Sequence, residues 1–221
     1  MAERVFLREV RLENINKTLL FYQNSVGNVS CVVWDAALVL TKYLEKRSGS
    51  NDQWLKGLKV IELGAGLGCV GITAACYGAE VTLTDLPNVI PQLEKTIELN
   101  RTSWAGRGTV TAGPLAWGSN KQGNIDTSKK PDIILLSDCV YYEESVEPLM
   151  ETLKNLCGYN TEIILSQEKR ESEKQKEVWK QFLDKFYSEF LVLKVPTNEQ
   201  DEIYASPDIH LLHAKRGRFM N

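Results

Sequence analysis

Three glycines stand at alternate positions, Gly64, Gly66 and Gly68, directly after a short apolar run that contains one acid, Glu62. The small, apolar residues 69–77 follow and have the character of a helix. A strand, a glycine turn and a helix in this order let a ligand approach bare backbone, because glycine has no Cβ and reaches positive φ. The Glu62 carboxylate can face that ligand and hold the amino-acid end of a zwitterionic cofactor.

A second predicted strand, residues 80–84, ends at Asp85. This acid follows the glycine turn by about 20 residues, the spacing at which a carboxylate reaches a ribose diol in nucleotide-binding folds. An acid there suits a free 2′-hydroxyl and disfavours a 2′-phosphate. Because NAD and S-adenosylmethionine share this ribose geometry, the spacing leaves both cofactors open.

Asp138 and Tyr141 follow a third apolar run, residues 132–136, which is typical of a central parallel strand buried on both faces. Ligands of open parallel sheets bind outside the carboxyl ends of the strands, so Asp138 is expected in the same crevice as Glu62 and Asp85. A carboxylate and a phenol there can orient an incoming amine. The alternative is that Asp138 caps the next turn and that Tyr141 and Tyr142 fill the rim.

The elements that must position these groups alternate between strands and helices. Before them, residues 4–13 and 18–22 predict a β-hairpin, and residues 31–44 predict a helix with Asp35 as its N-cap. Trp34 is then either a core residue or part of the rim, together with Trp117. Residues 47–52 are predicted to form a surface loop.

The rest of the chain continues the alternation and ends in two strands without a helix between them. The predicted elements are a helix over 89–100, a polar connection over 101–107, a strand over 108–115, a polar loop over 120–130, a helix over 146–157, a strand over 162–165, an exposed amphipathic helix over 171–186, and strands over 190–195 and 209–214. The order predicts a doubly wound sheet with one antiparallel strand near its edge.

The composition limits the class of protein. A chain of 221 residues with 43% hydrophobic residues is expected to form one domain over residues 1–221, and no apolar run is long enough to span a membrane. The net charge is −3 and no basic run alternates with aromatics, so no nucleic-acid partner is expected. The five cysteines form no C-x-x-C pair; they predict reduced thiols, no metal site, and a cytoplasmic protein, with the nucleus open as a second compartment.

Several motifs together resemble a known family. Residues 62–68 resemble the first motif of class I S-adenosylmethionine-dependent methyltransferases, and residues 138–141 match the D-x-x-Y signature of the family 16 (methyltransferase-like 21 type) protein-lysine methyltransferases. Further matches lie at residues 33–37, 117–118 and 141–145. The resemblance spans nearly the whole chain. It implies an α/β fold of the seven-stranded, Rossmann-like class I type, extended by an N-terminal β-hairpin within residues 1–30.

The resemblance also implies the cofactor and the site. The cofactor would be S-adenosyl-L-methionine, and a substrate-lysine role, which we treat as catalytic, falls to Asp138 and Tyr141. Lysine, with a reference pKa of about 10.4, must lose its proton before it accepts a methyl group. The expected cofactor contacts, with Glu62 and Leu86 added beside the family positions, are Trp34, Glu62, Gly64, Ala65, Gly66, Asp85, Leu86, Trp117 and Ser137.

Within that family, residues 31–44, 138–149 and 206–210 are most similar to the member that methylates valosin-containing protein, a hexameric AAA ATPase. This implies a protein substrate that receives up to three methyl groups, and we expect the enzyme to be a monomer. One departure concerns Gln167, which stands where the family resemblance predicts an aromatic residue. If that position walls the lysine channel, target choice or methylation degree differs here.

Other functions fit the residues less well. A methyltransferase of small molecules or nucleic acid is disfavoured because residues 138–141 are not the Asn/Asp-Pro-Pro-Tyr type of motif that resembles adenine-N6 enzymes. An NAD-dependent oxidoreductase is disfavoured because no Tyr-x-x-x-Lys pair follows the glycine turn. A binding module that has lost catalysis would show a broken cofactor motif. His210 and His213 are expected to be structural.

Overall fold

The computed structural model describes residues 5–24, 29–118 and 129–217. One seven-stranded sheet forms its centre, in the order β5-β4-β3-β6-β7-β9-β8. This order, with helices on both faces, confirms the predicted seven-stranded α/β fold. The strands are β3 (Lys59–Leu63), β4 (Glu80–Asp85), β5 (Thr109–Pro114), β6 (Ile133–Ser137), β7 (Glu162–Glu168), β8 (Phe190–Lys194) and β9 (Ile209–Arg216).

The antiparallel strand lies one position inside the edge. β9 pairs antiparallel with both β7 and β8, whereas β3 to β7 are mutually parallel. The prediction of one antiparallel strand near the edge is therefore confirmed. The parallel registers bring the carboxyl ends of β3, β4 and β6 to one rim, where Leu63 faces Thr84 on one side and Leu136 on the other.

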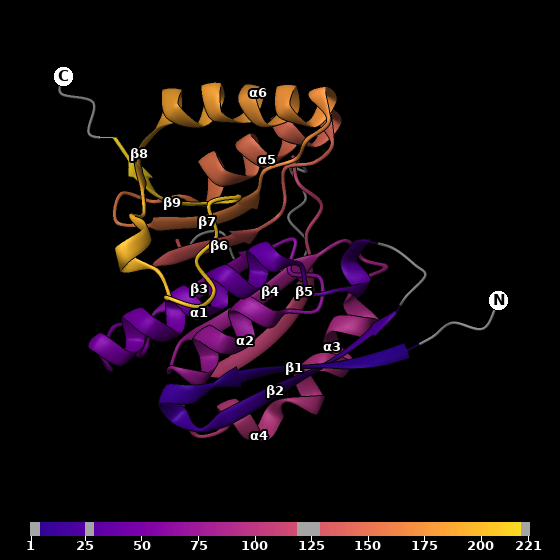
Figure 1. The fold of residues 1–221 in the computed structure, drawn as a ribbon, viewed down its shortest axis with the longest axis vertical. Coiled ribbons are helices and arrows are strands. Elements are labelled where there is room, and N and C mark those ends of the chain that lie inside the picture. The colour runs from indigo at the N-terminus through magenta and orange to yellow at the C-terminus, as the bar shows by residue number, and fades with distance from the viewer. Residues whose placement is uncertain (1–4, 25–28, 119–128, 218–221) are drawn as a thin grey trace.

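Two helical layers cover the sheet (Figure 1). One layer holds α1 (Asp35–Ser50), α2 (Cys69–Cys76), α3 (Ile90–Leu99) and the short α4 (Arg101–Trp104); the other holds α5 (Glu143–Leu156) and α6 (Glu173–Glu189). Successive residues of β6 enter opposite cores, because Ile133 packs with the first layer and Ile134 with the second. A strand that is apolar on both faces explains the continuous hydrophobic run in the sequence.

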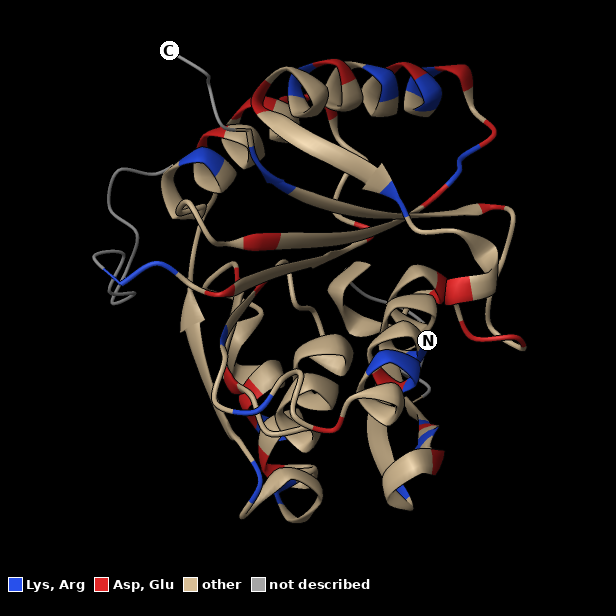
Figure 2. Ribbon diagram, turned by 90° about the vertical axis from the view of Figure 1, so that its left-hand side faces the viewer, with Lys and Arg blue, Asp and Glu red and all other residues tan. Residues whose placement is uncertain are grey.

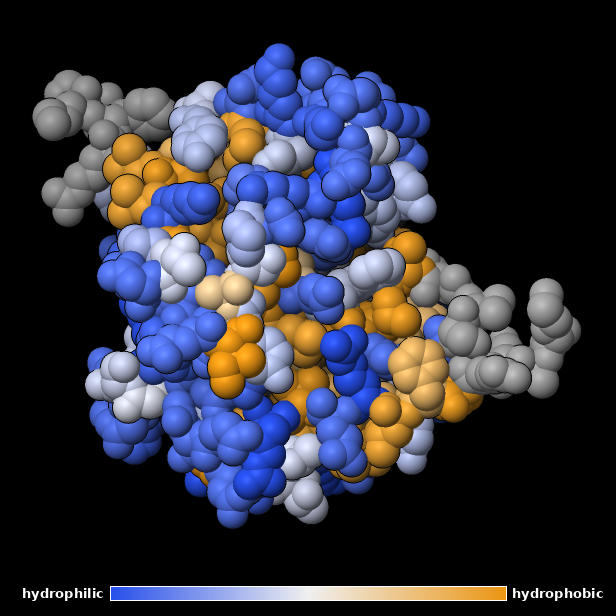
Figure 3. Space-filling model, viewed as in Figure 1, coloured by the Kyte–Doolittle hydropathy of each residue, from blue (hydrophilic) through white to orange (hydrophobic). Residues whose placement is uncertain are grey.

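The N-terminal hairpin is present as predicted, with β1 (Val5–Leu12) paired antiparallel to β2 (Lys17–Asn24). Phe21 is fully buried and belongs to the core under α1 and α2. Asn100 ties the hairpin to the end of α3, because its side chain accepts from Leu20 N at 2.8 Å and donates to Leu20 O at 2.9 Å. The start of β1 instead exposes apolar side chains, including Val5 and Leu7 (Figure 3).

Three local predictions are wrong. Asp35 is the first residue of α1 rather than its N-cap, and its carboxylate lies 4.0 Å from Arg8. Residues 47–50, predicted as a loop, extend α1, because Asn14 of the hairpin packs on that turn: a Cβ on Gly49 would lie 2.4 Å from Asn14 Nδ2. The connection over 101–107 contains the short helix α4.

The surface chemistry follows the charge pattern. Acidic and basic residues line the exposed side of α6, the helix at the top of Figure 2, while Val178, Phe182 and Phe186 face the core. All five cysteines are free thiols and four of them are buried. In the part of the chain that the structure describes, no helix could cross a membrane and no cluster of three or more metal-type ligands occurs. Most of the predicted loop over 120–130 lies outside the described residues.

Candidate active site

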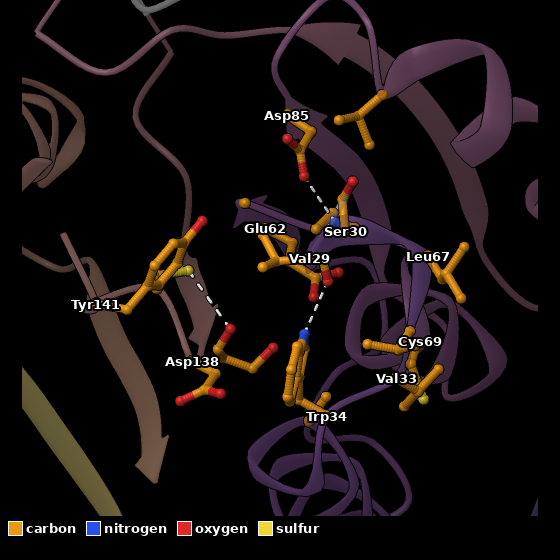
Figure 4. A pocket seen from close by; sticks show the side chains of 18 of the residues that line it. Val29, Ser30, Val33, Trp34, Glu62, Leu67, Cys69, Asp85, Asp138 and Tyr141 are labelled. Atoms are coloured by element: carbon orange, nitrogen blue, oxygen red, sulfur yellow. Dashed lines mark hydrogen bonds between the residues drawn. The ribbon is translucent and has the colours of Figure 1, made fainter. Parts of the chain in front are cut away.

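A single pocket gathers the predicted site residues at the carboxyl ends of β3, β4 and β6 (Figure 4). Every residue that the sequence analysis assigned to the cofactor or to catalysis lines it, although the residues come from five separate segments of the chain: Trp34, Glu62, Gly64, Ala65, Gly66, Asp85, Leu86, Trp117, Ser137, Asp138 and Tyr141. Convergence at this rim is what the sheet topology requires.

The glycine turn forms the floor of the pocket. Gly64, Gly66 and Gly68 have φ of 64°, 54° and 77°, the left-handed region that favours glycine. A Cβ on Gly64 would lie 2.9 Å from Cys139 Sγ and 3.1 Å from the Trp117 ring. Glycine is therefore needed both for the turn and for the space above it.

Asp85 holds the turn from the neighbouring strand. Its carboxylate accepts from Gly66 N at 2.8 Å and from Leu86 N at 2.7 Å. Burial raises the pKa of the Asp85 carboxyl, and these two backbone donors oppose the shift. A carboxylate can accept about four hydrogen bonds, so Asp85 keeps acceptor sites for a ribose diol.

Glu62 lies deeper than a charged cofactor contact would require. It is 1% exposed, and its Oε2 accepts from Gly71 N at 2.8 Å at the start of α2. Burial raises its pKa to about 8, so the carboxyl is largely protonated at neutral pH. Glu62 lines the pocket as predicted, but its fixed contact is with the protein backbone.

Two indoles and an aliphatic side chain shape the mouth. Trp34 is 39% exposed and its Nε1 donates to Val29 O at 2.8 Å, which excludes a pure core role for this residue. Trp117 is partly buried against the second core, and Leu86 is exposed at the rim. Figure 4 shows Trp34 and Val29 facing the same opening as Asp138. Flat apolar walls of this kind can cover a purine or a methionine chain.

Asp138 is held by side-chain as well as backbone partners. It follows β6 with φ of 54°, a left-handed conformation that aspartate tolerates better than most residues. Its Oδ1 accepts from Gln167 Nε2 at 2.9 Å and from Glu168 N at 3.3 Å, and its Oδ2 pairs with the Arg170 guanidinium. Burial raises the pKa of the Asp138 carboxyl, and Arg170 opposes this shift.

The capping alternative for Asp138 is therefore wrong. α5 begins at Glu143, Tyr142 is its N-cap residue, and none of the described side chains caps it. The partners of Asp138 instead come from the end of β7, one strand away in the sheet. Tyr141 lies on the same wall, with its ring centroid 4.5 Å from that of Tyr142, and burial raises its pKa to about 12.

Two further residues surround Asp138: Arg170, which the sequence motifs did not single out, and Gln167, which they singled out only as a possible wall of the lysine channel. Arg170 lines the pocket, pairs with Asp138 and with Glu168 (2.6 Å), and lies 5.6 Å from the Trp34 ring centroid. Gln167 is not a lining residue, so it does not wall a channel; it is 1% exposed and binds Asp138 from behind. The available signal was the polar run Ser166, Gln167 and Glu168 directly after the apolar residues 163–165.

The pocket thus has two ends with different chemistry. The end at β3 and β4 offers glycine backbone, an acid and apolar walls, which fits a nucleoside cofactor with a free ribose diol. The end at β6 and β7 offers a carboxylate and a phenol that can orient an amine. The residues present therefore fit S-adenosylmethionine at one end and an amine acceptor at the other.

Comparison with known proteins gives the same class of chemistry. A family model described as "Lysine methyltransferase" matches residues 13–188. EEF1A lysine methyltransferase 3 of Xenopus tropicalis is 36% identical over 178 residues, covering 79% of this chain and 72% of that protein. Protein N-lysine methyltransferase METTL21A of Danio rerio is 37% identical over 180 residues, covering 80% and 75%.

Solved structures agree with the fold. The 16S rRNA methyltransferase RsmC of T. Thermophilus, in complex with AdoMet and guanosine, matches with a TM-score of 0.62 at 18% identity. The match covers 98% of this chain and 51% of that one, so this chain spans about half the length of RsmC. The glycopeptide N-methyltransferase MtfA matches with a TM-score of 0.54 at 15% identity. At these identities the likeness concerns the fold alone.

Proposed function

The chain belongs to the lysine methyltransferase family and uses S-adenosylmethionine, and from that premise we propose that its acceptor is a lysine of valosin-containing protein, methylated up to three times. What supports this proposal is the location of the three segments whose sequence resembles the enzyme that methylates valosin-containing protein. Residues 31–44 and 138–149 contribute Trp34, Asp138 and Tyr141 to the pocket. Residues 206–210 lie beside the first of these segments, because Ile209 packs with Ala36 and Val39 of α1.

The donor end would hold the cofactor. S-adenosylmethionine, when bound, supplies an electrophilic methyl group on a sulfonium. Gly64 and Gly66 would let the cofactor lie close to the backbone, and Asp85 would accept from the ribose hydroxyls. Trp34 and Trp117 would cover its flat and apolar parts, with Ala65, Leu86 and Ser137 as further contacts. Glu62 is proposed to support this end through its neutral carboxyl.

The acceptor end would orient the amine. A lysine reacts only after it loses its proton, so the pocket must favour the neutral amine and aim its lone pair at the methyl group. Asp138 would accept a hydrogen bond from the amine, and Tyr141 would close the channel to bulk water. Correct orientation contributes up to about 7–11 kcal/mol to such a reaction, so no dedicated strong base is required.

A lysine of elongation factor 1A is a second candidate acceptor. A relative named for that substrate is 36% identical to this chain over 79% of its length. The two acceptors belong to the same reaction class, and both would use the same pocket. The proposal also includes action in the cytoplasm as a monomer, and the five free thiols agree with a reducing compartment.

The test compares the two proteins directly. Purified enzyme, tritiated S-adenosylmethionine and equal amounts of valosin-containing protein or elongation factor 1A are incubated, and mass spectrometry identifies the labelled lysine and its methylation state. We expect label on valosin-containing protein. Label on elongation factor 1A alone would overturn the proposed substrate.

Two variants make the assay specific to the site. Asp138→Asn should lose the label, whereas Asp184→Asn, an exposed aspartate on α6, should keep it. The same reaction in cell extract identifies the labelled band if neither purified protein is the acceptor.

A further inference from the structure

Gln167 occupies an unusual place for a buried amide. It lies on β7 between the apolar core and the pocket wall, and 1% of it is exposed. Its Oε1 accepts from Val140 N at 3.0 Å, and its Nε2 donates to Asp138 Oδ1 at 2.9 Å and to Val140 O at 3.2 Å. One side chain therefore satisfies two backbone groups and one carboxylate oxygen of the same turn.

The conformation of this turn depends on contacts from outside the turn. Asp138 has a left-handed backbone, which most side chains avoid, and the segment from Asp138 to Tyr142 belongs to no helix or strand. The backbone supplies one link, since Asp138 N donates to Ser166 O at 2.9 Å. Gln167 supplies the links at Asp138 and Val140 that set how the acid and Tyr141 lie relative to each other.

The two oxygens of the Asp138 carboxylate have different partners. Gln167 and the Glu168 amide together fill Oδ1, which has about two acceptor sites. Oδ2 pairs with Arg170, a pocket-lining residue, while Gln167 does not line the pocket. Oδ2 is therefore the oxygen on the pocket side, and it keeps an acceptor site for an amine.

We propose that Gln167 is a positioning residue for methyl transfer, which holds the 138–141 turn and presents Asp138 to the acceptor amine through Oδ2 alone. This inference rests on the proposed role of Asp138 in orienting the amine. Gln167 acts through Asp138 and does not touch the acceptor itself. Its predicted signature is a loss in turnover without a loss in cofactor binding.

Gln167→Glu is the most informative variant because it keeps the shape and the acceptor for Val140 N but replaces the donor to Asp138 by an oxygen. We expect kcat to fall about 10- to 100-fold, the usual effect of losing a hydrogen bond to a charged group. The dissociation constant for S-adenosylmethionine should change less than about two-fold, because the donor end is untouched.

The pH profile separates positioning from folding. The ionisable groups around Asp138 are Arg170, Glu168 and Tyr141, with the buried thiol of Cys139 beside them. A second carboxyl at position 167 raises the pKa of Asp138 further, so the acid limb of kcat against pH should move to higher pH in Gln167→Glu. The limb would stay in place if the titration of Asp138, which Gln167 contacts, did not control turnover.

Gln200→Glu is the matched control. Gln200 is also buried, and its Nε2 donates to Val195 O at 3.0 Å, but it does not line the pocket. The control should lower thermal stability and leave kcat and the acid limb unchanged. Equal losses of kcat in the two variants, or wild-type kcat in Gln167→Glu, would overturn the proposal.

The acceptor in these assays is whichever protein the wild-type enzyme labels in cell extract, so failure of valosin-containing protein as the substrate leaves the test intact. A second readout needs no acceptor. Hydrogen exchange of the peptide that contains Val140 should speed up in Gln167→Ala, since the Val140 amide loses its partner. Unchanged exchange there would by itself contradict the proposal.

Discussion

The two ends of the pocket are built by different means. At the donor end the partners of the acid are backbone groups, because the Asp85 carboxylate accepts from Gly66 N in the glycine turn and from Leu86 N. At the acceptor end Asp138 is held mainly by side chains, Gln167 and Arg170, that come from another strand. A cofactor of constant structure can be bound by a backbone cradle. The shape of an acceptor site is set by side chains such as these.

The two ends also differ in the charge of their buried acids. Glu62 at the donor end is fully enclosed and accepts from the Gly71 amide, and burial raises its pKa to about 8. Asp138 at the acceptor end is also largely buried, but Arg170 partly offsets the rise of its pKa. The donor end therefore holds a neutral carboxyl at pH 7, and the acceptor end keeps an ion pair. The Arg170 guanidinium there is shared between Asp138 and Glu168.

The largest expected effect tests the acceptor end. Asp138→Ala should reduce methyl transfer by about 10²–10⁴-fold, the range for loss of a carboxylate that handles a proton or orients its carrier. Cofactor affinity, measured by titration calorimetry, should stay within a few-fold. Asparagine adopts the left-handed backbone as readily as aspartate. The activity of Asp138→Asn therefore shows the effect of losing the charge while the turn is kept. An Asp138→Ala enzyme with wild-type activity would show that Asp138 does not orient the amine at the acceptor end.

The next effect tests the neutral carboxyl at the donor end. The pKa of Glu62 is raised from 4.5 to about 8, so the folded protein keeps a proton that the unfolded chain releases near pH 4.5. This stability is complete below pH 4.5 and is lost as the pH rises toward 8. The loss amounts to roughly 3 kcal/mol between pH 4.5 and 7.

Urea unfolding of wild type and Glu62→Gln across this range measures that contribution. The wild-type free energy of unfolding should fall more steeply with pH than that of the variant, because glutamine does not titrate. Parallel curves would mean that Glu62 is ionised in the folded protein, and the donor end would then carry a buried negative charge.

The smallest effect tests the backbone cradle. Asp85→Ala removes the acceptor of Gly66 N and the proposed ribose contact, and should weaken S-adenosylmethionine binding about 10- to 100-fold. Asp132→Ala is a matched control, because Asp132 also accepts from a backbone amide, Lys59 N at 2.8 Å, but at the opposite end of β3. Equal cofactor affinity in the two variants would show that Asp85 does not contribute to cofactor binding at the donor end.

The donor end could be predicted from the sequence because its causes are local. Gly64, Gly66 and Gly68 are close in the chain, and their alternation after an apolar run already requires a turn with positive φ. The position of Asp85 at the pocket could be predicted from its spacing after the glycine turn, which matches the length of one β-α-β unit. Asp138 and Tyr141 could be assigned to the rim for the same reason, since they follow a strand that is apolar on both faces.

What the sequence alone determined is therefore the succession of strands and helices and the acids at the strand ends. The tertiary structure decided the partners of those acids. The register of β6 with β7, in which Ser137 faces Ser166, brings Gln167 and Arg170 to Asp138 across about 30 residues of chain. It also extended α1 past Gly49, because the hairpin packs there. Contacts between distant segments depend on strand pairing and side-chain packing, and no local pattern encodes them.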